Sequence, residues 1–276
     1  MPGEPTQAAL DLAWAINSPS LVDGSNVAPT PPLDLDDIDK EHLVGFLQTE
    51  PPAHRVGRYF EQLIHYWLQH VREVEVVATG LQLKDGKITV GEIDFLYRDE
   101  TGTLVHCEAS VKYFLCAPGS EPSEFPGPNA RDSFEAKTTK LFDKQLMSSV
   151  DRVDDVGDRH GLVKGMIFYH HDEAEISSPH RLSKDHVRGR WLRASELHSL
   201  ESAHTSFAIV QKPHWLAPVA TADVLDTAEL IKTLAKHFAG TAHPVMLSGR
   251  SNVDSGLSPT EDERLFVVSD QWPNRI

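Results

Sequence analysis

The chain has 276 residues, of which 40% are hydrophobic and 24% are charged. This is the composition of a globular protein that is long enough for one sizeable core or two small ones. The formal net charge of -15 at pH 7 counts against a protein that coats nucleic acid non-specifically, because binding many phosphates needs local positive charge.

Cysteine content and hydropathy indicate the compartment. The two cysteines, Cys107 and Cys116, are nine residues apart on one predicted strand. Their side chains would then point to opposite faces, so we expect no disulfide and a reducing, cytoplasmic setting. No apolar run approaches the roughly 18 residues that span a bilayer, and the N-terminus lacks the basic region of a secretory signal. We therefore expect no membrane partner.

The N-terminal part of the chain predicts helices. Apolar residues recur at helical spacing over residues 7–17, and a Pro-, Ser- and Gly-rich stretch over 18–34 predicts an irregular arm. A short helix is predicted over 36–48. The strongest helical pattern covers 55–70, where Glu61 lies at the edge of an apolar stripe. The stripe consists of Val56, Phe60, Leu63, Ile64 and Trp67.

Three strands follow these helices. Residues 74–83 and 88–97 flank the sequence Lys-Asp-Gly-Lys at 84–87, which is a strong hairpin signal. A second turn at 99–102 leads into a third strand over 104–115. We therefore predict a three-stranded antiparallel meander that follows a helix.

The rest of the chain continues the alternation of helices and strands. A Pro-rich loop is expected over 117–128, followed by a long helix over 129–150 with Asn129 as its N-cap. Further strands are predicted over 164–170, 207–212, 245–247 and 265–269, and an amphipathic helix over 224–238. We expect a single α/β domain over 1–276, with residues 1–50 as a helical arm packed on it and 171–276 as an extension of the same domain.

The third strand separates apolar from polar residues. Its odd positions are nearly all apolar, whereas its even positions include His106, Glu108, Ser110 and Lys112. Since side chains on a strand alternate between faces, one face is predicted to be core and the other polar. Such a polar face is either a functional site or a solvated surface with ordinary Glu–Lys pairing.

The second turn fixes the register of this polar face. If Asp99 pairs with Thr103, Asp94 lies opposite Glu108, with Cβ atoms roughly 4.5–5.5 Å apart. Two carboxylates at that distance repel each other, and a divalent cation bound by both removes the repulsion. The pairing therefore predicts a metal site. Lys112 is too far along the strand to bind the same cation, but its flexible side chain could reach a phosphate.

A basic run over 180–193 interrupts the acidic chain. It carries Arg181, Lys184, Arg188, Arg190 and Arg193 against one acidic residue, Asp185. A solvated loop and a nucleic-acid contact are both open interpretations of such a run. Lys137, Lys140 and Lys144 form a second cationic stripe, on the helix predicted over 129–150.

The order of helix, three antiparallel strands, helix and strand resembles the core of the PD-(D/E)xK nuclease-like, or restriction-endonuclease-like, superfamily. GRYFEQL resembles the superfamily's helical Glu, here Glu61, and GEIDF resembles its metal-binding Asp, here Asp94. EASVK resembles its Glu and Lys, here Glu108 and Lys112. Gln145 matches a polar position of its second helix. The superfamily places Lys two residues after the acidic residue, whereas Ser110 stands there in this chain.

The wider chain also resembles a bacterial family known as domain of unknown function 1853. The resemblance covers nearly the whole chain. It is carried by LAWAINSP, VGRYFEQLIHYWL, GEIDFLYRD, HCEASVKYFL, GPNARDSFEAK and RLFVVSDQWP.

The nuclease resemblance implies a Mg²⁺- or Mn²⁺-dependent phosphodiesterase acting on DNA or RNA. Asp94 and Glu108 would bind the metal with the help of Glu61, and Lys112 would stabilise the transition state. Gln145 or Lys144 would contact the phosphate, and the basic run, through Arg181, Arg188 and Arg190, would hold the nucleic-acid backbone. The alternative is a nuclease-like fold without catalysis that binds a protein or nucleic-acid partner. The acidity of the chain and Ser110 motivate this alternative.

Overall fold

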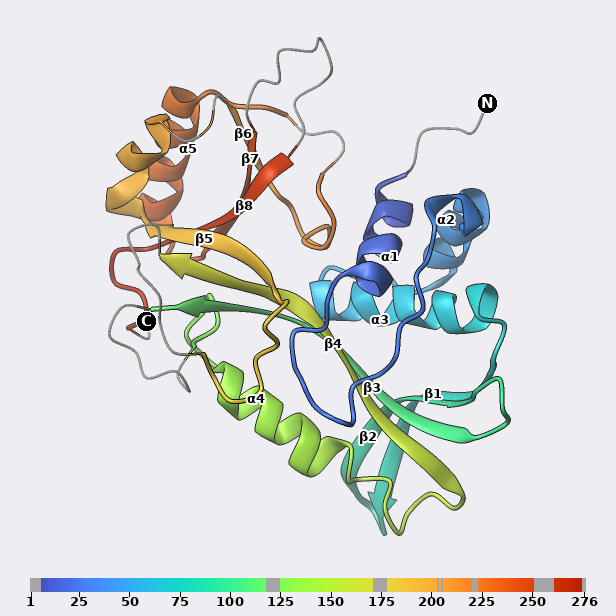
Figure 1. Ribbon diagram of the computed structural model, residues 1–276. Helices are drawn as coiled ribbons and strands as arrows, with labels where there is room; N and C mark the ends of the chain where they lie inside the picture. The colour runs from blue at the N-terminus through green and yellow to red at the C-terminus, as the bar shows by residue number, and fades with distance from the viewer. Residues whose placement is uncertain are drawn as a thin grey trace. The chain divides into compact units, whose positions relative to one another are not determined.

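The computed structural model describes residues 6–117, 125–170, 178–202, 204, 206–219, 223–250 and 261–274, which form an α/β fold with a mixed eight-stranded sheet (Figure 1). The strands are β1 (Glu75–Asp85), β2 (Ile88–Arg98), β3 (Leu104–Cys116), β4 (Val156–His170), β5 (Val187–Arg193), β6 (Ser206–Ile209), β7 (Val245–Arg250) and β8 (Glu261–Val268). Their order in the sheet is β1-β2-β3-β4-β5-β8-β7-β6. The predicted α/β class and the antiparallel meander β1-β2-β3 are confirmed.

Helices precede the meander and connect later strands. The α-helices are α1 (Gln7–Asn17), α2 (Lys40–Thr49), α3 (Val56–Tyr66), α4 (Phe134–Lys140) and α5 (Thr227–Gly240). Two of them continue as π-helical segments, α3 into η2 (Trp67–Val71) and α4 into η4 (Leu141–Gln145). Short 3-10 helices are η1 (Leu35–Asp37) and η5 (Ala194–Ser202). No described helix is long and apolar enough to cross a membrane.

Contacts divide the chain into two compact units, each assembled from several segments. The first unit comprises segments 1–112, 136–165 and 181–186, and the second comprises 113–135, 166–180 and 187–276. The single domain expected over 1–276, with 1–50 as its arm and 171–276 as its extension, stays a prediction.

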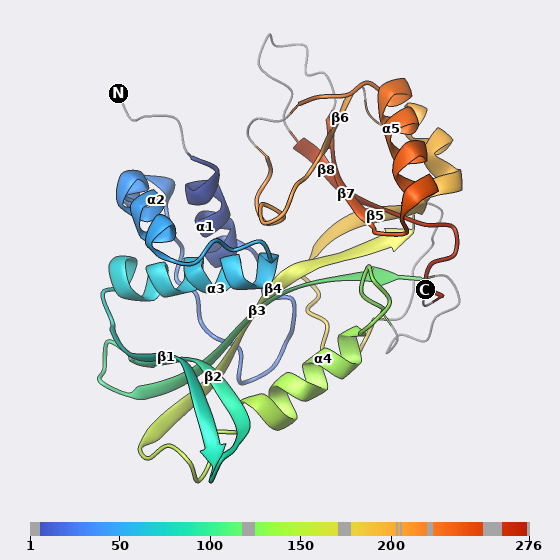
Figure 2. The same cartoon turned by 180° about the vertical axis from the view of Figure 1, so that it is seen from behind.

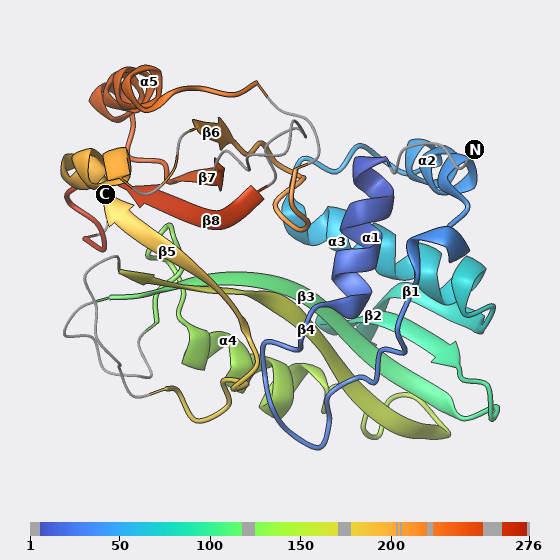
Figure 3. The same ribbon diagram turned by 45° about the horizontal axis from the view of Figure 1, so that its top comes forward.

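The meander and two helical segments form the centre of the first unit. α3 lies on one face of these strands, and α4 with η4 lies on the other (Figure 3). The apolar stripe of α3 is buried as predicted, with Phe60, Leu63 and Ile64 fully inaccessible. A core cluster that includes Ile93, Leu96 and residues of β1 packs between the strands and the turns after η4. The helix and the meander predicted around the site are therefore present.

The N-terminal arm of the first unit is tied to β4 by a buried lysine. The Lys164 ammonium donates hydrogen bonds to the main-chain oxygens of Ile16 and Ser18, where α1 ends. Burial lowers the pKa of Lys164 to about 8. Tyr59 of α3 donates to the buried carboxylate of Asp11 in α1. These buried polar contacts are satisfied, as burial requires.

The second unit has its own core between α5 and the strands β5–β8 (Figure 2). Leu230 and Leu234 of α5 pack with buried residues of β5, β6, β7 and β8. α5 begins with a capping box in which Asp226 and Glu229 bind each other's main-chain N–H groups. The predicted helix over 224–238 is thus confirmed, with its first turn at Thr227.

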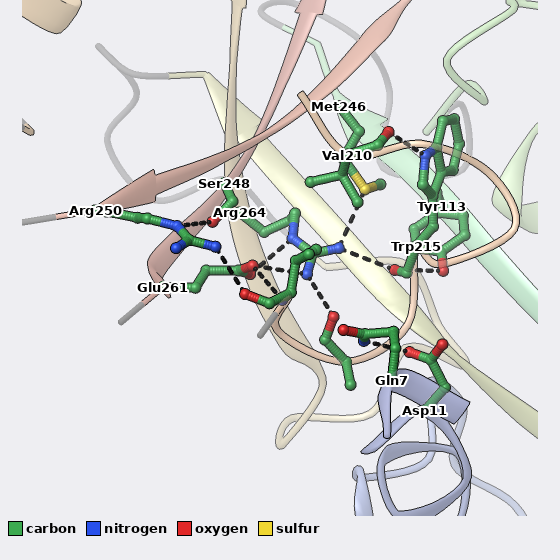
Figure 4. Close-up of polar contacts among 12 residues, drawn as sticks. Gln7, Asp11, Tyr113, Val210, Trp215, Met246, Ser248, Arg250, Glu261 and Arg264 are labelled. Atoms are coloured by element: carbon green, nitrogen blue, oxygen red, sulfur yellow. Dashed lines mark hydrogen bonds and ion pairs between the residues drawn. The ribbon is translucent and has the colours of Figure 1, made fainter. Parts of the chain in front are cut away.

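A buried arginine organises the polar interior of the second unit (Figure 4). Arg264 of β8 donates to the main-chain oxygens of Trp215 and Ala217, at 3.1 and 2.8 Å, and pairs with Glu261 at 2.7 Å. Tyr113 also donates to the Trp215 oxygen, at 2.9 Å. Arg264 thereby fixes the segment around Trp215 without being exposed to solvent.

Three predicted elements differ from the structure. The helix expected over 129–150 with Asn129 as its N-cap begins only at Phe134. The preceding residues form a turn instead, which is closed by hydrogen bonds from Phe134 N–H to Phe125 O and from Gly127 N–H to Asp132 O. The strand expected over 164–170 begins earlier, at Val156. The basic run is not a loop throughout, since 187–193 form β5 with Trp191 and Leu192 buried. Most of the loop expected over 117–128 lies outside the described residues.

Candidate functional site

The register predicted for the polar face is confirmed from the turn as far as Phe95 and Cys107. Asp99 N–H donates to Thr103 O at 3.0 Å, and β2 and β3 pair from Arg98↔Leu104 to Phe95↔Cys107. Asp94 directly precedes Phe95 in β2, and its carboxylate accepts a hydrogen bond of 3.0 Å from the main-chain N–H of Ala109. The Asp94 side chain thus accepts a main-chain N–H of β3 next to the point where the pairing of β2 and β3 ends.

The carboxylate of Asp94 is half-buried in an acidic environment. Burial and the charge of Glu108 raise the pKa of Asp94 to about 7, with smaller contributions in the same direction from Glu61 and Glu92, and the hydrogen bond from Ala109 opposes this rise. The predicted closeness of Asp94 and Glu108 is therefore reflected in the electrostatics of Asp94. A cation among these carboxylates would relieve their repulsion.

Both carboxylate oxygens of Glu108 accept hydrogen bonds. Its side chain is 1% exposed. Oε1 lies 2.9 Å from His106 Nε2, and Oε2 accepts a hydrogen bond of 2.7 Å from Gln145 Nε2 of η4. The interpretation of this strand face as solvated is therefore wrong for His106 and Glu108. Gln145 thus binds Glu108, and its predicted contact with phosphate stays a prediction.

A small cavity lies beside Asp94 and is lined by α3, β1 and β2. It offers about 60 Å³ to water-sized molecules, and four of its lining residues are carboxylates, namely Glu50, Glu61, Glu92 and Asp94. Arg58 also lines it and donates to Glu61 Oε2 at 3.1 Å. Glu61 thus lies at the edge of the buried stripe, as predicted, and reaches the same cavity as Asp94.

Lys112 and Ser110 lie further along β3, and both are half-buried. The main-chain oxygen of Lys112 is so close to Gly165 that a Cβ on Gly165 would lie 1.8 Å from it. The role of Lys112 at the reacting phosphate stays a prediction.

The arginines predicted to contact nucleic acid each make contacts within the chain. Arg181 stacks over Phe142 at 4.6 Å, and Arg188 over Tyr169 at 3.9 Å. Arg190 pairs with Glu263, which also binds His204. Lys144 is exposed on η4. The nucleic-acid role of these four residues stays a prediction, because stacked arginines and Lys144 still present charge to solvent.

Several residues of the site had no signal in the sequence pattern strong enough to single them out. Glu92 and Arg58 lie two and three residues from the predicted Asp94 and Glu61, so the period of a strand and of a helix turn could have indicated them. His106 was seen only as part of the polar face. Ser149, which binds His106 at 2.8 Å, lies 43 residues further along the chain.

The metal-binding capacity of the site rests on few protein ligands. Within the described residues, no three His, Cys, Asp or Glu side chains are grouped so as to hold a metal ion. Mg²⁺ is commonly bound by one or two carboxylates together with waters and substrate phosphates. Asp94 and Glu108 fit that mode as two carboxylates: half-buried Asp94 lines the water-sized cavity, and Glu108 is buried.

Comparison with known proteins identifies a family but no characterised relative. A family model described as Domain of unknown function (DUF1853) matches residues 10–268, which is most of the chain. No curated protein and no solved structure matches the chain.

Proposed function

The chain belongs to the DUF1853 family, and from the geometry of its carboxylate site we propose that it is a metal-dependent, nuclease-like phosphodiesterase acting on nucleic acid. The observation that carries the proposal is the half-buried Asp94, whose pKa is raised to about 7 by burial and by Glu108. A protein built for stability alone avoids such a pair. The resemblance of GEIDF and EASVK to the nuclease motifs supports the same function.

Asp94 and Glu108 would hold a Mg²⁺ or Mn²⁺ ion, with Glu61 lining the adjoining cavity. When bound, the ion would supply electrostatic stabilisation of the negative charge that develops on a phosphate. Gln145 keeps the Glu108 carboxylate in place at 2.7 Å. Arg58, which lies between Glu50 and Glu61, and Lys112 would orient a phosphate.

The first test is a nicking assay with Mn²⁺ on supercoiled DNA and on RNA. We expect Asp94→Asn and Glu108→Gln each to lower the rate on the order of 10³-fold, because several kcal/mol of transition-state stabilisation depend on the ion. Asp85→Asn is the matched control, since this carboxylate is exposed at the hairpin of β1 and β2. Intact DNA and RNA after incubation with wild-type protein and Mn²⁺ at neutral and alkaline pH would refute catalysis.

A second candidate function is a nuclease-like fold that binds a partner without catalysis. Ser110 at the position of the superfamily lysine, and Arg190 already paired with Glu263, favour this candidate. Lys112→Ala separates the two, because it should abolish nicking under the first proposal and leave partner binding unchanged under the second.

A further inference from the structure

A chain of hydrogen bonds within the first unit connects Arg159 to Glu108 through Ser149 and His106. Arg159 Nε lies 3.0 Å from Ser149 Oγ, Ser149 Oγ lies 2.8 Å from His106 Nδ1, and His106 Nε2 lies 2.9 Å from Glu108 Oε1. Ser149 and His106 are fully inaccessible to solvent. The three side chains come from β4, the turn region after η4, and β3.

Donor and acceptor chemistry gives this chain one direction. The Arg159 guanidinium has only N–H donors, so Ser149 Oγ accepts from it and keeps its own O–H to donate. An ionised Glu108 can only accept, so His106 Nε2 carries the proton that it shares with the carboxylate. The Nδ1 atom of a neutral ring is then the acceptor of the Ser149 O–H. Every bond therefore points from the guanidinium toward the carboxylate.

We propose that His106 is a positioning residue, which, locked in its Nε2–H tautomer by Ser149 and Arg159, aims the Glu108 carboxylate at a divalent cation. This inference deepens the proposed function and rests on it. Gln145 secures the second oxygen, so each oxygen of Glu108 carries one hydrogen bond and keeps a lone pair for a metal. Outer partners that orient a ligand in this way typically change metal affinity 10–100-fold when removed.

The tautomer is measured on the full chain without metal, by ¹⁵N NMR of histidine-labelled protein at neutral pH. His106→Gln identifies the His106 signal by its loss. We expect the proton on Nε2, with Nδ1 accepting from Ser149, and we expect Ser149→Ala to weaken this preference because Nδ1 loses its donor. A ring that carries a proton on Nδ1 would overturn the inference, whatever the protein does with metal or nucleic acid.

The positioning role is measured by calorimetric titration of Mn²⁺ into the full chain. We expect His106→Ala to weaken Mn²⁺ binding about 10–100-fold and His106→Gln to restore most of the loss, because its amide can donate to Glu108 from a similar place. Ser149→Ala, which removes one hydroxyl, gives a smaller loss in the same direction if His106→Ala does not fold. Wild-type affinity in both His106→Ala and Ser149→Ala would overturn the role of His106.

The two arms separate this inference from the proposed function. A wild-type chain that binds no Mn²⁺ refutes the metal site, whereas the tautomer still decides whether the hydrogen-bond chain has the stated direction. A wild-type chain that binds Mn²⁺ but leaves nucleic acid intact refutes catalysis and leaves both arms of this test in force.

Discussion

At the scale of residues, Asp94 combines two effects that disfavour its ionised form, namely burial and the nearby charge of Glu108. Its side chain is half-buried, and burial together with the charge of Glu108 raises its pKa to about 7. A hydrogen bond from Ala109 N–H lowers this pKa. A residue with this balance destabilises the fold when it is ionised, which favours the proposed binding role over a role in stability.

The raised pKa of Asp94 predicts how the free energy of unfolding depends on pH. The pKa is about 7 in the folded state and about 3.9 in an unfolded chain. Between these values the folded state binds more protons, so the free energy of unfolding falls as pH rises from about 4 to about 7. Asp94→Asn removes this fall and should be more stable than wild type above neutral pH, by up to about 4 kcal/mol.

Urea denaturation at about pH 5 and about pH 8 measures this effect. Asp85→Asn, at an exposed position, is the control and should keep the pH dependence of the wild type. A wild-type pH dependence in Asp94→Asn would show that Asp94 does not titrate as its surroundings indicate.

At the scale of elements, the junction of β3 and β4 depends on one glycine. Gly165 has φ +148°, and a Cβ there would lie 1.8 Å from Lys112 O. We expect Gly165→Ala to destabilise the protein by about 3 kcal/mol or more, because the backbone of β3 must move. Gly45→Ala is the matched control, since Gly45 is an exposed residue of α2 with no atom within 4 Å of its added Cβ.

The control should stabilise the protein by about 0.5–1 kcal/mol, because Ala is a better helix former than Gly. Chemical denaturation of the two variants tests both signs. Similar free energies of unfolding for Gly165→Ala and wild type would mean that β3 and β4 are not packed as described.

The sequence was sufficient for elements specified by local chemistry. The Asp85-Gly86 turn fixed the first hairpin, where Gly86 has φ +59°. Asp99 fixed the second, because its carboxylate accepts from Thr101 and Thr103 N–H. The apolar period of α3 placed Glu61 at its edge. Turns and helical periodicity depend on residues that are close together in the chain, so both can be predicted from a single sequence.

Elements specified by distant contacts were predicted less well. The sequence of β5 resembles a solvated basic loop, because its arginines interrupt the apolar pattern of a strand. Its place in the sheet depends on a distant contact, since Trp191 donates to Cys116 O, 75 residues away. α4 begins late, because Phe134 N–H pairs with Phe125 O. The Asp94–Glu108 pair followed from turn register, whereas the link from His106 to Ser149 required the tertiary structure.

At the scale of the whole molecule, the charge of -15 means that nucleic acid would meet a predominantly acidic protein. Arg190 is already neutralised by Glu263, and the candidate cavity carries four carboxylates. Binding of a phosphate there requires bound cations to reverse the local charge. The proposed function and the metal site therefore depend on each other, and a cytoplasmic location stays a prediction.

The central claim is that the acidic pair exists to bind an ion, and anomalous diffraction from crystals of the full chain soaked in Mn²⁺ tests it most directly. We predict a manganese peak within about 2.0–2.3 Å of carboxylate oxygens of both Asp94 and Glu108, which Asp94→Asn crystals should lack. A map without a peak at these side chains under saturating Mn²⁺, with Glu108 still bound to His106 and Gln145, would contradict the claim.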